Sequence, residues 1–570
     1  MAGVLDSIKR DLAARLRRAA LEAEAAGELP GAPASVPAGE WPPLPVLDVP
    51  RERGHGDLAS NLALTMAGIL NRSPRRVGQA LLDHLELQGS LADRVELAGP
   101  GFLNFFLSPR WLYRVLEEVQ RLGPKYGASN LGGGRRIQVE FVSANPTGPL
   151  VVVNARAAAV EDALANLLQA VGFEVEREYY INDAGHQVEL LARSLEARLR
   201  ELLGQTAEVP EEGYPGEYLR DLASDLLQRR GREAVDALLA LEPGQRWEVL
   251  GREAVAELVA QQRRTLEDYG VQFDVWFSER ELRARGVLEE ALGVLERRGY
   301  TYRHEGALWF RSTALGDDKD RVLIRSGGEP TYLATDIAYH LDKYRRGFHR
   351  VIDIWGPDHH GYIARMKSAV EALGQGRDAL EVLIVQLVRL LRGGEAVRMS
   401  KRGGEFVTMD ELVAEVGKDA ARFFFLMRSP DSHLDFDLDL ARLQSADNPV
   451  YYVQYAHARI CSIFGRGGPQ VPPADRADLS LLRDESELDL MRHLGYFPQE
   501  VAGAALGREP HRITRYLLEL AGLFHAFYTR CRVLSEDPGL TAARLVLTQA
   551  VQTVLRNGLG LLGVEAPEHM

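Results

Sequence analysis

The sequence predicts a multidomain α/β protein with a doubly wound, Rossmann-like nucleotide-binding domain that carries a helical insertion. A small α+β domain precedes this domain and an all-α bundle follows it. Three observations support this prediction. At 570 residues the chain is too long for one hydrophobic core. Between Arg135 and Leu391, β-rich runs alternate with helical apolar periods. After Asn448 the pattern is helical almost to the end of the chain.

The composition narrows the possible functions. A net charge of −13 argues against indiscriminate binding to nucleic acid, so an RNA partner would have to meet a local basic surface. Cys461 and Cys531 lie far apart in no metal-ligand spacing, so we expect no protein-bound zinc or other metal. No apolar run is long enough to span a bilayer, and the N-terminus lacks a secretory core. We therefore expect a cytoplasmic protein without membrane contact.

Residues 1–112 are predicted to form the N-terminal α+β domain. Leucine and isoleucine at helical spacing predict an amphipathic helix over 1–24, and the Ala/Pro/Gly-rich stretch 27–45 predicts a loop. A second helix is expected over Leu58–Leu70 and a strand over Phe102–Leu107. From these residues alone, the domain could be only a packing appendage.

The chain is arranged around the stretch from Arg135 to Asp162. Ile137, Val139 and Phe141 alternate as in a strand, an Asn/Pro/Gly turn follows, and a helical period takes over from Ala155. A strand that turns directly into a helix aims the free N–H groups of the helix at the turn, where α/β proteins hold phosphate. An ordinary βα unit without a ligand is the alternative.

The central domain is predicted to span residues 113–445, with a largely helical, acidic insertion at about 190–260. Three further strands are expected, at Val271–Phe277, Gly306–Arg311 and Val351–Trp355, and the stretch Val382–Leu391 leads to a turn at Gly393-Gly394. In a doubly wound sheet, ligands gather beyond the carboxyl ends of the strands. The remaining residues, 446–570, form the predicted helical bundle.

Seven motifs follow one another in a characteristic order: VEFVSANPTGPL at 139–150, YYINDAGHQ at 179–187, FRSTALGDDKDRVLIRS at 310–326, TYLATDIAYHLDK at 331–343, WGPDHHGYIARMK at 355–367, RMSKR at 398–402 and NPVYYVQYAHARI at 448–460. In this order the motifs resemble those of bacterial arginyl-tRNA synthetases, which are class I aminoacyl-tRNA ligases. The resemblance extends over nearly the whole chain.

The chain departs from this resemblance at the nucleotide turn. Where the family carries His-x-Gly-His, this sequence has Val151-Val152-Val153-Asn154, and Ala157 and Glu161 occupy positions where close relatives tend to have glycine. Valine side chains donate no hydrogen bonds, and Val153 adds a branched Cβ where a nucleotide would need close approach. Two interpretations therefore stay open: an arginine–tRNA ligase, or a catalytically inactive synthetase-like protein that binds tRNA or arginine.

The resemblance implies an ATP-dependent reaction in which L-arginine becomes arginyl-adenylate and is then transferred to its tRNA. ATP is expected as a substrate, together with Mg²⁺. Catalytic roles are implied for Lys401, Ser400 and Asn154. The implied ATP-binding residues are Asn145, Pro146, Thr147, Gly148, Val151, Val153, Asn154, Arg398, Met399 and Lys401.

Recognition of arginine calls for acidic side chains, because a guanidinium presents five donors in a planar fork. Tyr332 and Asp336 stand four residues apart and would share one face of a helix. The resemblance implies that these two residues bind the guanidinium. It also implies that Glu140 and Asn145, at the end of the first central strand, bind the amino and carboxylate groups of the substrate. The same cleft is expected to be lined by Asp358, His359 and His360.

The resemblance also assigns both ends of the chain to tRNA for arginine, with the N-terminal domain at the outer corner and the bundle at the anticodon. Candidate tRNA-binding residues of the bundle are Tyr451, Tyr452, Gln454, Tyr455 and His457. We expect a monomer. A dinucleotide-dependent oxidoreductase is excluded because no Gly-rich fingerprint follows the first central strand.

Overall fold

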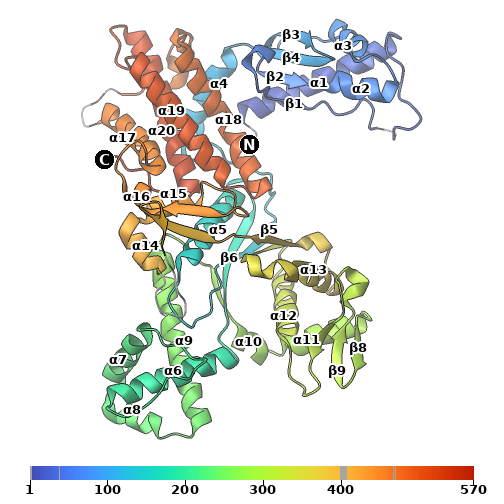
Figure 1. Cartoon of the computed structure of the whole chain (residues 1–570). Coiled ribbons are helices and arrows are strands. Elements are labelled where there is room, and N and C mark those ends of the chain that lie inside the picture. The colour runs from blue at the N-terminus through green and yellow to red at the C-terminus, as the bar shows by residue number, and fades with distance from the viewer. Residues whose placement is uncertain (1–2, 38, 398–406, 466–467, 469) are drawn as a thin grey trace.

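The structure is a computed structural model that describes residues 3–570 except 38, 398–406, 466–467 and 469. A parallel sheet lies at its centre, with the helical bundle above it and the helical insertion below (Figure 1). The N-terminal domain projects to one side at the level of the bundle, and a second lobe containing α11 and α12 lies beside the insertion (Figure 1). The predicted fold class, a Rossmann-like α/β domain between an α+β domain and a bundle, is confirmed.

The N-terminal domain packs helices on a four-stranded sheet of order β1-β2-β4-β3. The elements are α1 Val4–Ala25, β1 Leu47–Asp48, β2 Leu58–Ser60, α2 Leu62–Leu70, α3 Pro74–Asp83, β3 Ala92–Ala98 and β4 Phe102–Leu107. The strand at Phe102–Leu107 is confirmed. The helix expected over Leu58–Leu70 begins only at Leu62, because Leu58–Ser60 pairs antiparallel with β4 instead.

The central sheet has five parallel strands in the order β12-β11-β5-β6-β7. Their bounds are β5 Arg136–Glu140, β6 Glu174–Ile181, β7 Val275–Ser278, β11 Arg350–Trp355 and β12 Leu380–Ile384. The chain runs from β5 to β6 and β7 on one side and returns to β11 on the other. The order therefore reverses between β5 and β11, where a crevice opens at the carboxyl ends of such sheets.

Helix α5, Val152–Ala170, follows β5 and starts three residues before Ala155. The insertion consists of α6 His186–Leu202, α7 Tyr218–Arg230, α8 Arg232–Leu239 and α9 Pro243–Asp268. The second lobe and the return to the sheet comprise α10 Glu279–Ala284, α11 Val287–Arg297, β8 Thr301–His304, β9 Ala307–Phe310, β10 Arg321–Ile324, α12 Tyr332–Arg345 and α13 Ile363–Ala372.

The stretch Val382–Leu391 contributes to two strands, because the chain leaves the central sheet after Ile384. Val388–Arg392 forms β13, which pairs in parallel with β15, Leu434–Asp437, in a separate three-stranded sheet. The other elements here are β14 Glu395–Ala396, α14 Met409–Val416, α15 Lys418–Phe425 and α16 Leu438–Arg442.

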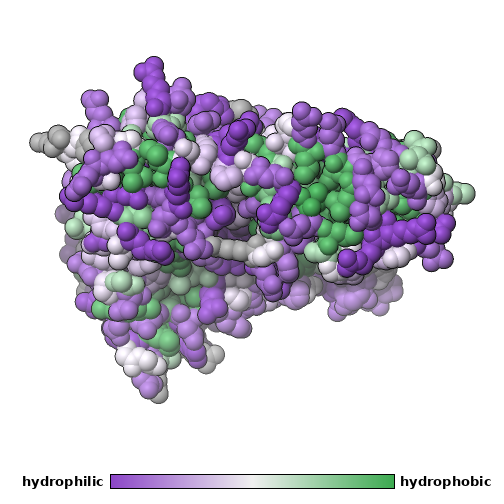
Figure 2. Space-filling view, turned by 90° about the horizontal axis from the view of Figure 1, so that it is seen from above, coloured by the Kyte–Doolittle hydropathy of each residue, from purple (hydrophilic) through white to green (hydrophobic). Residues whose placement is uncertain are grey.

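The C-terminal bundle is helical as predicted. It contains α17 Pro449–Phe464, α18 Glu485–Gly507, α19 His511–Arg530 and α20 Pro538–Leu561, and it packs against α4, Arg110–Leu122, and α5. Seen from above, the surface is mostly hydrophilic, with hydrophobic side chains showing between polar ones over the bundle and the N-terminal domain (Figure 2). No helix of the described residues is long and apolar enough to cross a membrane.

Candidate active site

The backbone bends sharply where β5 ends. Val142 and Ser143 have φ values of 61° and 38°, a left-handed conformation that is uncommon for a β-branched residue and typical of functional sites. The bend is held by the hydroxyl of Ser143, which donates to Glu140 Oε1 at 3.0 Å and accepts the backbone N–H of Tyr180 at 3.1 Å. The end of β5 is thus tied to β6, and the Glu140 carboxylate has a fixed neighbour.

The predicted nucleotide turn lies between this bend and α5. Gln262 of the insertion donates to the carbonyl oxygen of Gly148 at 2.9 Å, and the Tyr218 hydroxyl donates to that of Thr147. Asn145 and Pro146 precede them in the same turn. At the start of α5, Asn154 Oδ1 accepts the N–H of Val151 at 2.9 Å. Asn154 therefore caps its own helix, and its side-chain oxygen is occupied by a backbone N–H.

The valine side chains of the turn replace donors with methyl groups. Val151 and Val153 are half-buried, whereas Val152 is buried in the core. The first turn of α5 still leaves leading N–H groups without partners inside the helix, and these can face an anion. The positive end of α5 is present at the turn, but the valine side chains there add no hydrogen-bond donors to it.

Arg398, Met399, Ser400 and Lys401 lie outside the described residues. The segment that follows them can be placed: Thr408 forms an antiparallel bridge with Val151, and the N–H of Met409 donates to the carbonyl oxygen of Leu150 at 2.9 Å. The chain that leaves the RMSKR motif therefore runs alongside the nucleotide turn.

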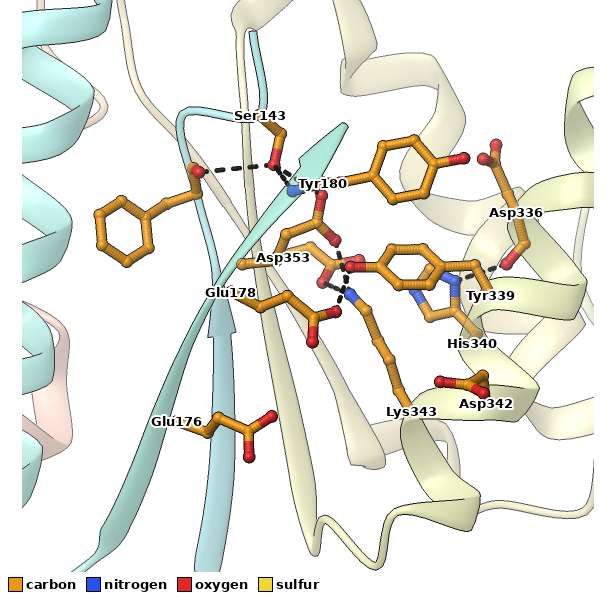
Figure 3. A network of polar contacts seen from close by, with 12 residues as sticks. Ser143, Glu176, Glu178, Tyr180, Asp336, Tyr339, His340, Asp342, Lys343 and Asp353 are labelled. Carbon is orange, nitrogen blue, oxygen red and sulfur yellow. Dashed lines mark hydrogen bonds and ion pairs between the residues drawn. The ribbon is translucent and has the colours of Figure 1, made fainter. Parts of the chain in front are cut away.

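A row of acidic side chains crosses the sheet beside this turn (Figure 3). Asp353 of β11 is in register with Glu140 of β5, which is in register with Glu178 of β6. Lys343 of α12 places its Nζ 2.6 Å from Glu140 Oε2 and 2.7 Å from Asp353 Oδ1. Burial opposes the charge on Asp353, but Lys343 and His340 outweigh it and hold its pKa below the usual range. This carboxyl is therefore ionised.

Asp336 and its surroundings form the second acidic position. The hydroxyl of Tyr362 donates to Asp336 Oδ2 at 2.6 Å. Burial raises the pKa of Asp336 to about 6, and the nearby carboxylates of Glu140 and Glu279 add to the rise. The carboxylate of Glu140 thus acts on Asp336 by repulsion, and a cation bound near both would be stabilised by both.

The other residues expected at the arginine site are more exposed. Tyr332 is the first residue of α12 and is 71% exposed, so it lies one turn from Asp336 on the solvent side. Asp358, His359 and His360 are exposed on the short 3₁₀ helix Pro357–Tyr362, with the ring of His359 6.1 Å from that of Trp355.

Sequence reasoning missed five side chains of the acidic site. Lys343 and Tyr362 lie inside the motifs, but no local pattern marks them, because Lys343 meets Glu140 203 positions away and Tyr362 meets Asp336 26 positions away. Glu178, Glu279 and Asp353 were also missed. A signal existed for Asp353, a single carboxylate inside the apolar run Val-Ile-Asp-Ile-Trp, since such residues are rarely buried unless they are paired.

Glu161 of α5 lies near Glu140 but, unlike Glu140, has no cation beside it among the described residues. Its side chain is 0% exposed, and neither carboxyl oxygen has a hydrogen-bond partner within bonding geometry among the described residues. Burial raises the pKa of Glu161 well above its ordinary value. The neighbouring N–H of Val142 offsets part of this rise, and the charge of Glu140 adds to it. When this buried carboxyl is ionised, it lowers the stability of the folded protein.

The candidate tRNA-binding residues of α17 divide into two groups. Tyr451 and Tyr455 are half-buried and stacked, with ring centroids 6.0 Å apart, and Tyr452 lies against the ring of His525. Gln454 and His457 are buried and contact protein: Gln454 donates to Asp419 and to the carbonyl oxygen of Glu565, and His457 Nδ1 donates to that of Pro567. The second group holds the C-terminal segment in place.

A cavity of about 800 Å³ opens next to the tyrosines. The guanidinium of Arg459 stands 4.9 Å from the ring centroid of Tyr455 and 4.7 Å from that of Tyr528. Arg530 and Arg532 also line the cavity. Stacked rings flanked by three arginines suit a base and its phosphate.

Comparison with known proteins decides the family. Three family descriptions match in chain order: "Arginyl tRNA synthetase N terminal domain" over residues 6–107, "tRNA synthetases class I (R), catalytic domain" over 119–429 and "DALR anticodon binding domain" over 453–570. The chain belongs to the arginyl-tRNA synthetase family. The resemblance predicted from the motifs is confirmed.

Relatives of this arginyl-tRNA synthetase family match the chain from end to end. It is 51% identical over 573 residues to the arginine–tRNA ligase of Desulforamulus reducens and 53% identical over 572 residues to that of Moorella thermoacetica, with 100% of each chain covered. The solved structure of Thermus thermophilus arginyl-tRNA synthetase shares the fold, with a TM-score of 0.74, 24% identity and coverage of 99% of this chain and 100% of that one.

Proposed function

We propose that this protein is an arginine–tRNA ligase that acts on L-arginine, ATP and tRNA for arginine. The arginine carboxylate attacks the α-phosphate of ATP, which gives arginyl-adenylate and releases pyrophosphate. The terminal ribose hydroxyl of the tRNA then attacks the arginyl carbonyl and releases AMP. The observation that carries the proposal is a pair of carboxylates that influence each other electrostatically, Glu140 at the carboxyl end of β5 and Asp336 on α12, in a chain of this family.

In this proposal Asp336 and Glu140 compensate the charge of the substrate. The planar guanidinium needs carboxylate oxygens in its plane, and the exposed Tyr332 can close over it from the start of α12. Asn145 takes a polar group of the amino-acid moiety. The exposed loop residues Asp358 and His359, together with His360, border the same space.

ATP would lie over the turn from Asn145 to Gly148, with its phosphates toward the start of α5 and the RMSKR segment. Lys401 and Arg398 supply positive charge, Ser400 and Met399 belong to the same segment, and Mg²⁺ arrives with the nucleotide phosphates. The chain's own turn contributes the N–H groups of α5 and the amide of Asn154. Because Val151 and Val153 donate nothing, we propose that the nucleotide step is slow.

For the RNA, we propose division into an N-terminal tRNA-contacting domain at 1–112, a catalytic domain at 113–445 with its insertion at about 190–260, and an anticodon-binding domain at 446–570. The half-buried rings of Tyr451, Tyr452 and Tyr455 and the adjacent arginine-lined cavity support base stacking there. The protein would act as a monomer in the cytoplasm.

The altered turn supports a second candidate, a synthetase-like protein that binds arginine or tRNA without turnover. A single comparison separates the two. The variant Val151→His, Val153→Gly, Asn154→His adds a ring donor at the first position, exchanges the Asn154 amide for a second ring donor and removes two branched side chains. Each preorganised donor is worth about 3 kcal/mol, or on the order of 100- to 1000-fold in rate, so adenylate formation should rise by several orders of magnitude. Arginine affinity should hardly change.

The readouts are ATP–pyrophosphate exchange, ATP affinity and tRNA charging with labelled arginine. Val152→Ala is the matched control, because Val152 lies between the altered positions but faces the core. Adenylate formation that rises only in the triple variant supports the ligase. Arginine binding without adenylate in either protein supports the second candidate, and no arginine binding in either overturns both the ligase and arginine recognition.

A further inference from the structure

The acidic row of the central sheet places three buried carboxyl groups next to one another. Asp353, Glu140 and Glu178 stand opposite one another on three neighbouring strands, and their side chains are 1%, 12% and 0% exposed. Like charges directly opposite in a sheet repel, and burial removes the water that would screen them. Such a row can be held only if cations lie against it.

Helix α12 supplies those cations from successive turns. Lys343 reaches both Glu140 and Asp353, while Arg346, at the end of the helix, pairs with Glu178. Lys343 is 0% exposed, so its ammonium group has no contact with solvent. Burial lowers the tendency of Lys343 to be charged, but Asp353, Glu140 and Glu178 outweigh it and raise its pKa.

Both oxygens of Glu140 are fixed by this arrangement. Oε2 accepts from Lys343 at 2.6 Å and Oε1 accepts from the hydroxyl of Ser143 at 3.0 Å. Each oxygen of a carboxylate can accept a further donor, so the group remains able to bind a substrate N–H. The orientation of its plane is set before any substrate arrives.

The same contacts extend to Asp336. His340 lies one turn before Lys343, with Nε2 2.9 Å from Asp353 Oδ2 and Nδ1 donating to the backbone carbonyl oxygen of Asp336 at 2.8 Å. A continuous path of hydrogen bonds therefore joins Glu140, through Lys343, Asp353 and His340, to the helical turn that carries Asp336. Figure 3 shows the part of this path from Lys343 to Asp336.

We propose that Lys343 is a positioning residue for arginine recognition, which holds the carboxylate of Glu140 in one orientation and lends it a compensating positive charge. Lys343 touches no substrate and acts through Glu140. The inference rests on the proposed function, because it takes Glu140 and Asp336 as the groups that bind arginine.

Two methionine variants separate positioning from simple stabilisation. Lys343→Met and Arg346→Met each remove one cation of α12 from the acidic row, but only Lys343 contacts Glu140. Isothermal titration with L-arginine should show about a tenfold or larger rise in Kd for Lys343→Met, which corresponds to one pKa unit of lost charge compensation. Arg346→Met should keep the wild-type Kd within about twofold, even if it melts at a lower temperature.

A pH series adds a readout that a purely structural role would not change. Burial raises the pKa of Glu140, and Lys343 opposes that rise. Without Lys343, Glu140 should take up a proton more readily, so the arginine affinity of Lys343→Met should rise more steeply between pH 7 and 9 than that of the wild type. Lys343→Arg keeps a cation at this position and should restore part of the affinity.

A second variant distinguishes a loss of arginine binding from a failure to fold. If Lys343→Met does not fold, the double variant Lys343→Met, Asp353→Asn removes one buried charge of each sign and should fold, yet it should still bind arginine weakly. Wild-type arginine affinity in folded Lys343→Met or in the folded double variant, or equal losses in Lys343→Met and Arg346→Met, would overturn the inference. Failure of the wild type itself to bind arginine would instead overturn the proposed function, and this inference with it.

Discussion

Replacing Glu161 by methionine should stabilise the protein, and increasingly so as the pH rises. The substitution keeps the two methylene groups of the side chain but removes a carboxyl that is fully buried and has no hydrogen-bond partner within bonding geometry in the described part of the chain. Leaving a buried polar group unsatisfied costs about 1–3 kcal/mol. We expect a gain of that size at pH 5, where the carboxyl is protonated in the folded protein.

The pH dependence follows from the raised pKa of Glu161. In the unfolded chain, the Glu161 carboxyl loses its proton near pH 4.3. In the folded protein, burial keeps the proton bound up to a much higher pH. The folded state therefore holds one more proton in that window, so the free energy of unfolding falls by about 1.4 kcal/mol for each pH unit. This contribution is fully present below the unfolded pKa and is lost as the pH rises through the folded pKa. Glu161→Met removes the slope.

The assay is urea denaturation at pH 5, 6, 7 and 8, comparing wild type, Glu161→Met and Glu161→Gln. The glutamine variant loses the proton but keeps a buried polar group, so its stability should lack the slope and stay below that of Glu161→Met. Glu117→Gln, an exposed position on α4, is the control and should run parallel to the wild type. Parallel curves for wild type and Glu161→Met would refute the reasoning.

Three further perturbations test other parts of the molecule. Arginine affinity should fall as the pH drops through about 6, because the raised pKa of Asp336 lets it take up a proton there; calorimetry across that range checks this, and a flat profile contradicts it. Tyr455→Ala should weaken tRNA binding by about 1–3 kcal/mol while Tyr455→Phe does not, measured by fluorescence anisotropy; equal affinities would place the RNA elsewhere. Arg422→Met should cost about 3–5 kcal/mol in thermal denaturation, because buried Arg422 donates to Asp162 and to the carbonyl oxygen of Leu562; an unchanged melting temperature would contradict this.

Much of the architecture is determined locally and was therefore predictable from the sequence. The alternating residues before Asn145 and the helical period after it require a strand, a turn and a helix, whatever packs against them. The bundle after Asn448 follows from periodicity in the same way. The order of the motifs was enough to identify the family, and the altered turn at Val151–Asn154 is visible without any structure.

Other features depend on partners far away in the chain and needed the tertiary structure. Leu58–Ser60 has a helical pattern but becomes a strand because β4 offers it hydrogen bonds. Gln454 and His457 looked available to RNA, yet the C-terminal segment folds back and uses both side chains.

The acidic row shows the same division most clearly. The sequence identifies Glu140 as a strand-end carboxylate, but its alignment with Asp353 is a matter of strand register, which no local pattern determines. Its contact with Lys343 joins residues 203 positions apart. Sequence alone therefore determined which residues recur in this family and which are altered. Only tertiary packing decided which charges face each other, because Coulomb energies depend on distance and burial in the folded molecule.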